Sequence, residues 1–166
     1  MTTAPDHSVR WLDDVEMRAW RTFIETVNDV TDLLEADLQH GKGLSIGDYQ
    51  VLVFLSEAPE QRMRMSDLAA ELHLSPSGLT RRLDGLVRAG LVSRQPSVED
   101  RRVLLAVLTD AGFERIVDAA PVHVASVRRR LLDALTREQI EQLGGILDAV
   151  RAHLAADCPI GGCAND

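Results

Sequence analysis

The sequence predicts a mainly α-helical chain that carries one small β-hairpin, and three observations support this fold class. Apolar residues recur at helical spacing through most of the 166 residues, as in Leu79, Leu83 and Leu86. Several of these stretches begin at a capping residue and end at a glycine. Between residues 91 and 108 the pattern changes to two short apolar runs separated by a turn-rich loop, which is typical of a hairpin.

The first predicted helix covers residues 12–39. Asp13 and Glu16 have the spacing of a capping box at its start, and a glycine-containing segment ends it. A second helix is predicted to begin after Ser45 and to end before Pro59, because proline cannot continue a helix without losing a hydrogen bond.

Two closely spaced helices are predicted next. Residues 62–65 form a short extended piece, after which Ser66 caps a brief helix at residues 67–72. Another helix starts three residues later, where Ser75 is the N-cap and Pro76 occupies the first helical position. This spacing is that of a helix-turn-helix, a unit whose second helix enters the major groove of DNA.

The hairpin follows this helix after a glycine turn. Gly90 ends the helix in the left-handed conformation, and residues 91–94 form the first strand. Residues 95–100 form a loop, two arginines follow it, and residues 103–108 form the returning strand. A polar-faced helix beside a basic hairpin can bind a major groove and a neighbouring minor groove, so the segment predicts DNA binding.

Two further helices are predicted after the hairpin. Thr109 and Asp110 cap a long helix, which Pro121 is expected to kink or break because it lacks the backbone N–H. Thr136 and Gln139 form a capping box for the last helix. Together with the first helix, these segments carry more apolar residues than one small domain needs. This surplus favours a homodimer over an intramolecular bundle.

The net charge of −8 is unevenly distributed. Residues 81–102 hold six arginines against three acidic residues, a local excess of three positive charges, so the rest of the chain carries −11. Affinity for DNA depends on local phosphate neutralisation, and an acidic protein with one basic edge is therefore compatible with DNA binding.

Other function classes find little support in the sequence. We expect neither an enzyme nor a cofactor, because no nucleophile–base pair or phosphate-binding glycine loop is visible. The five histidines lack metal-ligand spacing. No apolar run of about 18 residues and no secretory signal are present, so we expect a cytoplasmic protein with no membrane partner.

Four short motifs follow one another between residues 77 and 112. They are Ser77-x-x-Thr80-Arg81-x-Leu83-x-x-Leu86, Gly90-Leu91-Val92-x-Arg94, Asp100-Arg101-Arg102 and Leu108-Thr109-x-x-Gly112. At this spacing they resemble the MarR family of winged helix-turn-helix transcriptional regulators, and the flanking helices extend the resemblance to residues 9–155. The resemblance implies an obligate homodimer on a pseudo-palindromic operator in double-stranded DNA. It also implies repression that a small ligand or an oxidant relieves.

The expected organisation has four parts. These are an N-terminal dimerisation region (1–44), a winged helix-turn-helix DNA-binding domain (45–108), C-terminal dimerisation helices (109–156) and a flexible tail (157–166). Cys158 and Cys163 in the tail are not part of the family pattern. They are interpreted as inert thiols, with a redox pair or a metal site as alternatives, because the cytosol keeps thiols reduced.

The resemblance also assigns candidate DNA contacts by position. The recognition helix and the wing match at Ser75, Ser77, Thr80, Arg81, Arg82, Arg101 and Arg102. Asp100 matches an acid that holds the shape of the wing. Arg81 can bind guanine or phosphate, or pair with Asp84 at i+3. Because Arg81 and Arg82 are adjacent on a helix, they cannot both face the same base edges.

Three further questions stay open at the level of sequence. One of Arg101 and Arg102 should enter the minor groove while the other pairs with an acid, and the sequence does not say which. Arg94 can contact a phosphate or form a salt bridge within the wing. Ser66 can bind phosphate at a helix N-terminus or act only as an N-cap.

The residues that would bind an effector are harder to identify from the sequence than the DNA contacts. The candidate ligand contacts lie in a cleft between the dimerisation helices and the DNA-binding domain, and they are Trp20, Phe23 and Tyr49. Apolar residues at helical spacing are equally compatible with a core. The competing function is a winged helix that binds a protein partner. That function predicts loss of the recognition and wing arginines, which this sequence retains.

Overall fold

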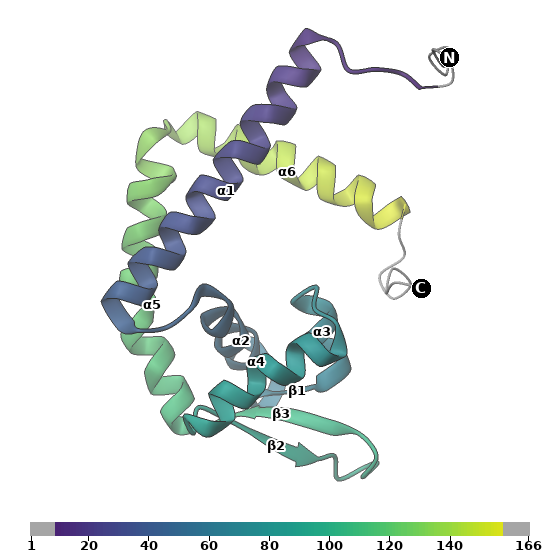
Figure 1. The fold of residues 1–166 in the computed structure, drawn as a ribbon, viewed down its shortest axis with the longest axis vertical. Helices are drawn as coiled ribbons and strands as arrows, with labels where there is room; N and C mark the ends of the chain where they lie inside the picture. The colour runs from purple at the N-terminus through teal and green to yellow at the C-terminus, as the bar shows by residue number, and fades with distance from the viewer. Residues whose placement is uncertain (1–8, 158–166) are drawn as a thin grey trace, which may run out of the picture.

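The computed structural model of the chain describes residues 9–157 and confirms a mainly helical fold with a small antiparallel sheet (Figure 1). The helices are α1 (Asp14–Lys42), α2 (Ile46–Glu57), α3 (Met65–Glu71), α4 (Pro76–Arg88), α5 (Asp110–Arg130) and α6 (Arg137–Asp157). The strands are β1 (Arg62–Arg64), β2 (Val92–Pro96) and β3 (Leu104–Leu108). Short 3-10 turns at Pro59–Gln61 and Leu132–Ala134 connect α2 to β1 and α5 to α6.

Predicted caps are present at the ends of α1 and α4. Asp13 and Glu16 form the expected capping box of α1, and Gly43 ends that helix at φ +59°. The Ser75 hydroxyl accepts a hydrogen bond from the Gly78 N–H at 3.1 Å, and Pro76 is the first residue of α4. These local signals explain why the start of each of these helices was predictable.

The helix-turn-helix is formed by α3 and α4. The turn between them has His73 at φ +51°, and the Leu74 N–H donates to the Ala69 carbonyl at 2.9 Å. Leu79 and Leu83 of α4 are buried in the core, which leaves the opposite face of the helix to solvent. The packing of α4 therefore decides which of its side chains can reach a partner.

The sheet has the order β1-β3-β2 with antiparallel pairing throughout. Its strands differ slightly from the prediction, because Gln95 and Pro96 continue β2 by pairing with Leu105 and Leu104, and β3 starts at Leu104. Pro96 is tolerated because β2 is an edge strand. The β2–β3 hairpin, called the wing below, extends beyond the helical core in Figure 1.

Two long helices, α1 and α5, pack against each other, and α6 follows α5 (Figure 1). The expected break at Pro121 does not occur, since α5 is one helix from Asp110 to Arg130. Pro121 and Val117, whose carbonyl loses its partner, both lie on the exposed side, where water can replace the missing N–H.

A polar cluster joins the two helices. The Asp37 carboxylate of α1 accepts hydrogen bonds from the Ser126 hydroxyl at 2.5 Å and from Arg129 at 2.7 Å. Arg130 donates to both of its oxygens at 3.1 Å. The Arg130 and Ser126 hydrogen bonds hold the pKa of Asp37 well below its usual range, so the cluster is built around the ionised carboxylate.

Candidate nucleic-acid interface

The first turns of α4 present a polar face to solvent. Ser77, Thr80 and Arg81 are exposed there. The Thr80 hydroxyl donates to the Pro76 carbonyl at 2.9 Å, which fixes its rotamer. Arg81 has no hydrogen-bond or ion-pair partner among the described residues, and the alternative pairing with Asp84 is absent there. Arg81 is thus a free guanidinium group on the solvent side of the helix.

Arg82 lies in a different environment from its neighbour. Its side chain is one-third exposed, and its Nη1 is 3.9 Å from the Asp48 carboxylate of α2. It also lies directly over the Gly47 backbone. The two adjacent arginines therefore point to different parts of the molecule, as the helical spacing required.

Arg94 braces the wing against α4. From β2, its Nη1 donates to the Asp84 carboxylate at 2.7 Å and its Nη2 donates to the Thr80 carbonyl at 2.9 Å. Its buried Nε has no partner within the described chain. Of the two alternatives for Arg94, the salt bridge within the wing is not formed, because the partner carboxylate is on the recognition helix, and a phosphate contact stays a prediction. Arg94 fixes how the wing stands relative to the face that carries Arg81.

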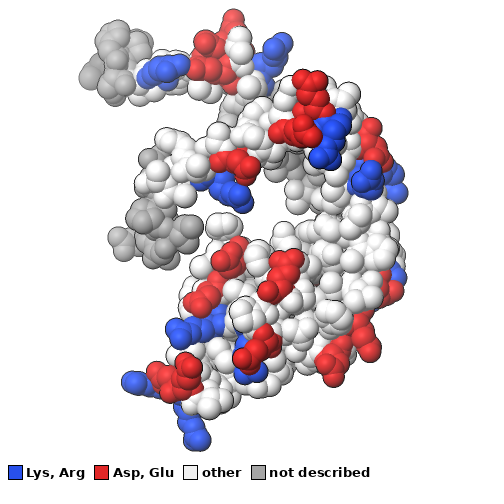
Figure 2. Space-filling view, turned by 180° about the vertical axis from the view of Figure 1, so that it is seen from behind, with Lys and Arg blue, Asp and Glu red and all other residues white. Residues whose placement is uncertain are grey.

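The tip of the wing separates its two arginines. The Asp100 carboxylate accepts from the Arg102 backbone N–H at 3.0 Å and from its Nε at 3.3 Å. Arg101 is exposed and has no partner in the described part of the chain. Figure 2 shows basic side chains projecting at the lower left, where the wing ends. Arg101 is accordingly the freer of the two.

Ser66 differs from its predicted role. Helix α3 begins at Met65 with Arg64 as its N-cap, so Ser66 is inside the first turn rather than at the cap. Its hydroxyl donates to the neighbouring Asp67 carboxylate at 2.9 Å. A side-chain cap of α3 is therefore absent. An acid beside Ser66 also makes this turn a poor site for phosphate.

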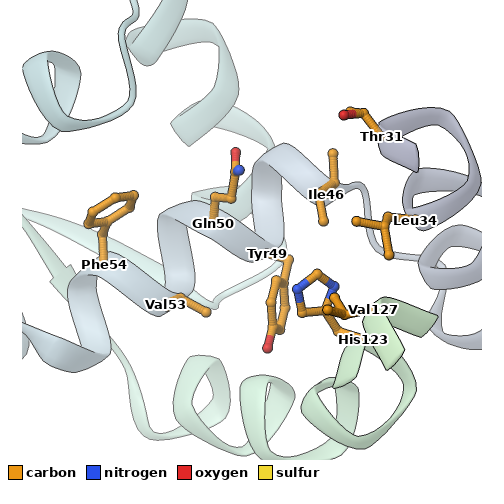
Figure 3. A pocket seen from close by; sticks show the side chains of 9 residues that line it. All are labelled: Thr31, Leu34, Ile46, Tyr49, Gln50, Val53, Phe54, His123 and Val127. Atoms are coloured by element: carbon orange, nitrogen blue, oxygen red, sulfur yellow. The ribbon is translucent and has the colours of Figure 1, made fainter. Parts of the chain in front are cut away.

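A pocket of about 350 Å³ lies where α1, α2 and α5 meet. Figure 3 shows the ring of Tyr49 from α2 beside the ring of His123 from α5; their centroids are 4.8 Å apart and their planes are tilted by 46°. His123 Nδ1 is buried with no partner among the described residues, and burial lowers the pKa of His123. Burial, with a smaller contribution from Glu57, raises the pKa of Tyr49. Both rings are consequently favoured in their neutral forms.

The other two predicted ligand contacts lie away from this pocket. Trp20 and Phe23 are exposed on the N-terminal half of α1, with ring centroids 6.4 Å apart, and they do not line it. Cys158 and Cys163 are outside the described residues. Within residues 9–157, no cluster of His, Asp and Glu has the arrangement of a metal site. No described helix is long and apolar enough to cross a membrane.

Two functional features escaped the sequence prediction. Gly47 receives Arg82, and His123 brings an unsatisfied ring nitrogen to the pocket. Gly47 is the second residue of α2, two positions after the Ser45 cap, and in a helix glycine indicates only a poor helix former. A lone histidine in a helix gives no indication of what its ring faces, so no signal in the sequence marked either residue.

Known proteins share this architecture. A family model described as MarR family matches residues 42–103. AbsC, a MarR family transcriptional regulator from Streptomyces coelicolor, is 44% identical with a TM-score of 0.83, over 89% of this chain and 99% of AbsC. Sco3205, a MarR family regulator from the same organism solved in complex with DNA, is 36% identical with a TM-score of 0.83. That match covers 90% of this chain and 93% of Sco3205.

A curated relative gives a shorter match. The HTH-type transcriptional repressor YetL of Bacillus subtilis is 31% identical over 102 residues, which are 60% of this chain. The match covers 61% of YetL, so the chain spans about three fifths of that relative.

Proposed function

The chain belongs to the MarR family of transcriptional regulators, and from this premise we propose that it is a homodimeric, sequence-specific DNA-binding repressor. In this proposal a small ligand, bound where the dimerisation helices meet the reading domain, releases the protein from its operator. Binding to the chromosome would place the protein in the cytoplasm.

The observation that carries the proposal is that the recognition helix and the wing each present an exposed arginine with no partner among the described residues. Arg81 is exposed on α4 and Arg101 is exposed on the wing, while nearby Arg94 and Arg102 are held by carboxylates. In the major groove Arg81 can bind guanine O6 and N7, with Ser77 and Thr80 beside it. Arg101 suits the minor groove.

Exposed apolar side chains support the dimer. The N-terminal half of α1 and the whole of α6 extend away from the core, and Figure 2 shows an open recess between them and the rest of the molecule. The apolar residues exposed on these helices are Val15, Trp20, Phe23, Ile24, Val27, Ile146, Leu147, Val150 and Leu154. This many large apolar side chains exposed on two helices is typical of an interface, and a second copy would bury them.

The dimer sets the geometry of the operator. Two copies of α4 related by a two-fold axis would enter successive major grooves about 34–36 Å apart, so the operator should be pseudo-palindromic. To release the protein from the operator, a ligand must bind more tightly to a conformation in which the two copies of α4 have a different spacing. Moving the equilibrium from 99% bound to 1% bound requires a preference of about 5.5 kcal/mol.

The pocket supports one chemical class of ligand. Its apolar walls, the neutral Tyr49 and His123 rings and the unsatisfied His123 Nδ1 suit an uncharged aromatic molecule with one hydrogen-bonding group. Among the described residues, no lysine or arginine lines the pocket, which disfavours a carboxylate. Trp20 and Phe23 belong to the proposed dimer surface instead.

The proposal is tested by selecting duplexes from a random pool with the purified protein. We expect a two-fold symmetric sequence, bound by a dimer, with affinity that falls steeply as salt rises. If a folded dimer selected no preferred sequence, the proposal of sequence-specific DNA binding would be contradicted. It would instead favour a winged helix that binds a protein partner.

A further inference from the structure

Arg82 is held by a feature of α2 that only glycine provides. A Cβ added at Gly47 would lie 1.6 Å from Nη1 of Arg82 and 2.4 Å from its Cζ, and the three nearest atoms all belong to Arg82. The guanidinium group thus lies against the bare backbone of the first turn of α2. The Asp48 carboxylate, 3.9 Å from Nη1, adds a weak ion pair whose side chains are about one-third exposed.

This position removes Arg82 from the free face of α4. A side chain that rests on α2 cannot also reach a phosphate without giving up the Gly47 contact. Arg81, one residue earlier, is exposed and has no partner among the described residues. We propose that Arg82 is a positioning residue, which sets the placement of the recognition helix by seating on Gly47, and that it does not contact DNA. This inference rests on the proposed function.

The contact between Arg82 and Gly47 is on the same turn of α2 that contacts α1 and lines the pocket. The Ile46 N–H donates to the Glu35 carboxylate of α1 at 2.6 Å. Ile46 and Tyr49 line the pocket, and Gly47 between them carries Arg82. One turn of α2 therefore touches the dimerisation helix, the pocket and the recognition helix. A shift of this turn would therefore also move the backbone at Gly47 that Arg82 contacts.

Two substitutions isolate the contact. Gly47→Ala adds a methyl group that meets only the flexible end of Arg82, and alanine favours the helix, so the variant should fold. Arg82→Ala removes the seated group. Each should weaken binding to the selected operator about three- to thirtyfold, the range seen for residues that act indirectly. In a double-mutant cycle, Gly47→Ala should have no further effect in the Arg82→Ala background.

The salt dependence provides the readout that a DNA contact would change. We expect the slope of log K against log salt to be the same for the wild type, Gly47→Ala and Arg82→Ala. A slope reduced by about 0.9 per subunit in Arg82→Ala would show a phosphate contact and overturn the proposal. Additive effects in the cycle, or unchanged affinity in Gly47→Ala, would also overturn it. If the wild type selects no operator, the proposed function fails, which is a separate result.

Discussion

The close approach of α5 to the base of the wing depends on Gly112. The Thr109 N–H donates to the Leu91 carbonyl at 3.1 Å, and the Thr109 hydroxyl caps the helix by accepting from the Gly112 N–H at 3.0 Å. A Cβ at Gly112 would lie 2.1 Å from the Leu91 carbonyl oxygen and 2.7 Å from Leu108 Cδ1. Gly112→Ala should therefore destabilise the protein where α5 joins the DNA-binding domain.

The magnitude follows from two opposing terms. Alanine gains about 1 kcal/mol over glycine in a helix. The new methyl group, however, is more than 1 Å short of an ordinary contact, which begins near 3.4 Å, and the nearest atom is backbone that cannot rotate away. Overpacking costs about 1–3 kcal/mol and can cost more, so a backbone clash belongs at or above the upper end. We expect a net loss of about 2–3 kcal/mol.

Thermal unfolding tests this prediction, with Gly85→Ala as the matched control. Gly85 is also helical, lies in α4 outside the proposed dimer surface, and a Cβ there meets nothing within 4 Å. Gly112→Ala should lower Tm by roughly 4–12 °C, given about 2–4 °C per kcal/mol at this chain length. The control should keep or raise Tm. Equal stability of the two variants would refute the argument from the Leu91 carbonyl.

Two further predictions concern the other charged groups. The Arg130 and Ser126 hydrogen bonds hold the pKa of Asp37 below its ordinary value of 3.8, so this stabilisation is present above about pH 4 and is lost as the pH falls further. Asp37→Asn should lower Tm at pH 7, and the gap from the wild type should narrow below pH 4; a constant gap would argue against the ionised cluster. At the wing, Arg101→Ala should weaken operator binding about tenfold or more, and Arg102→Ala less, since Arg102 is bonded to Asp100. The reverse ranking in a binding titration would show that Arg102 enters the groove.

Much of the fold was predictable because its signals are local. The Ser75-Pro76 start of α4, the Thr109 cap of α5 and the left-handed Gly90 each act within a few residues, and each is in its expected place. Pro121 shows the limit of such signals. Its cost depends on whether water can reach the freed carbonyl, and α5 continues through it because that side is exposed.

The fate of each arginine could not be predicted in the same way. The sequence places Arg81, Arg82 and Arg94 in one basic segment. Their partners depend on packing between elements, since Arg94 reaches back to Asp84 and Arg82 to Gly47. The predicted N-cap at Ser66 was wrong for a related reason, because β1 leads directly into α3 and the helix starts before the serine. Composition predicted a basic edge, and the fold determined which arginines are free on it.

Binding of Arg81→Ala to the selected operator tests the central claim most directly. The control is Arg137→Ala, which removes the same charge from an exposed arginine on α6 that is paired with Glu141. We predict that Arg81→Ala loses about 1–3 kcal/mol of affinity and relaxes the preference at one base position in each half-site, while Arg137→Ala binds like the wild type. If Arg81→Ala retained both affinity and specificity, α4 would not be the helix that reads DNA.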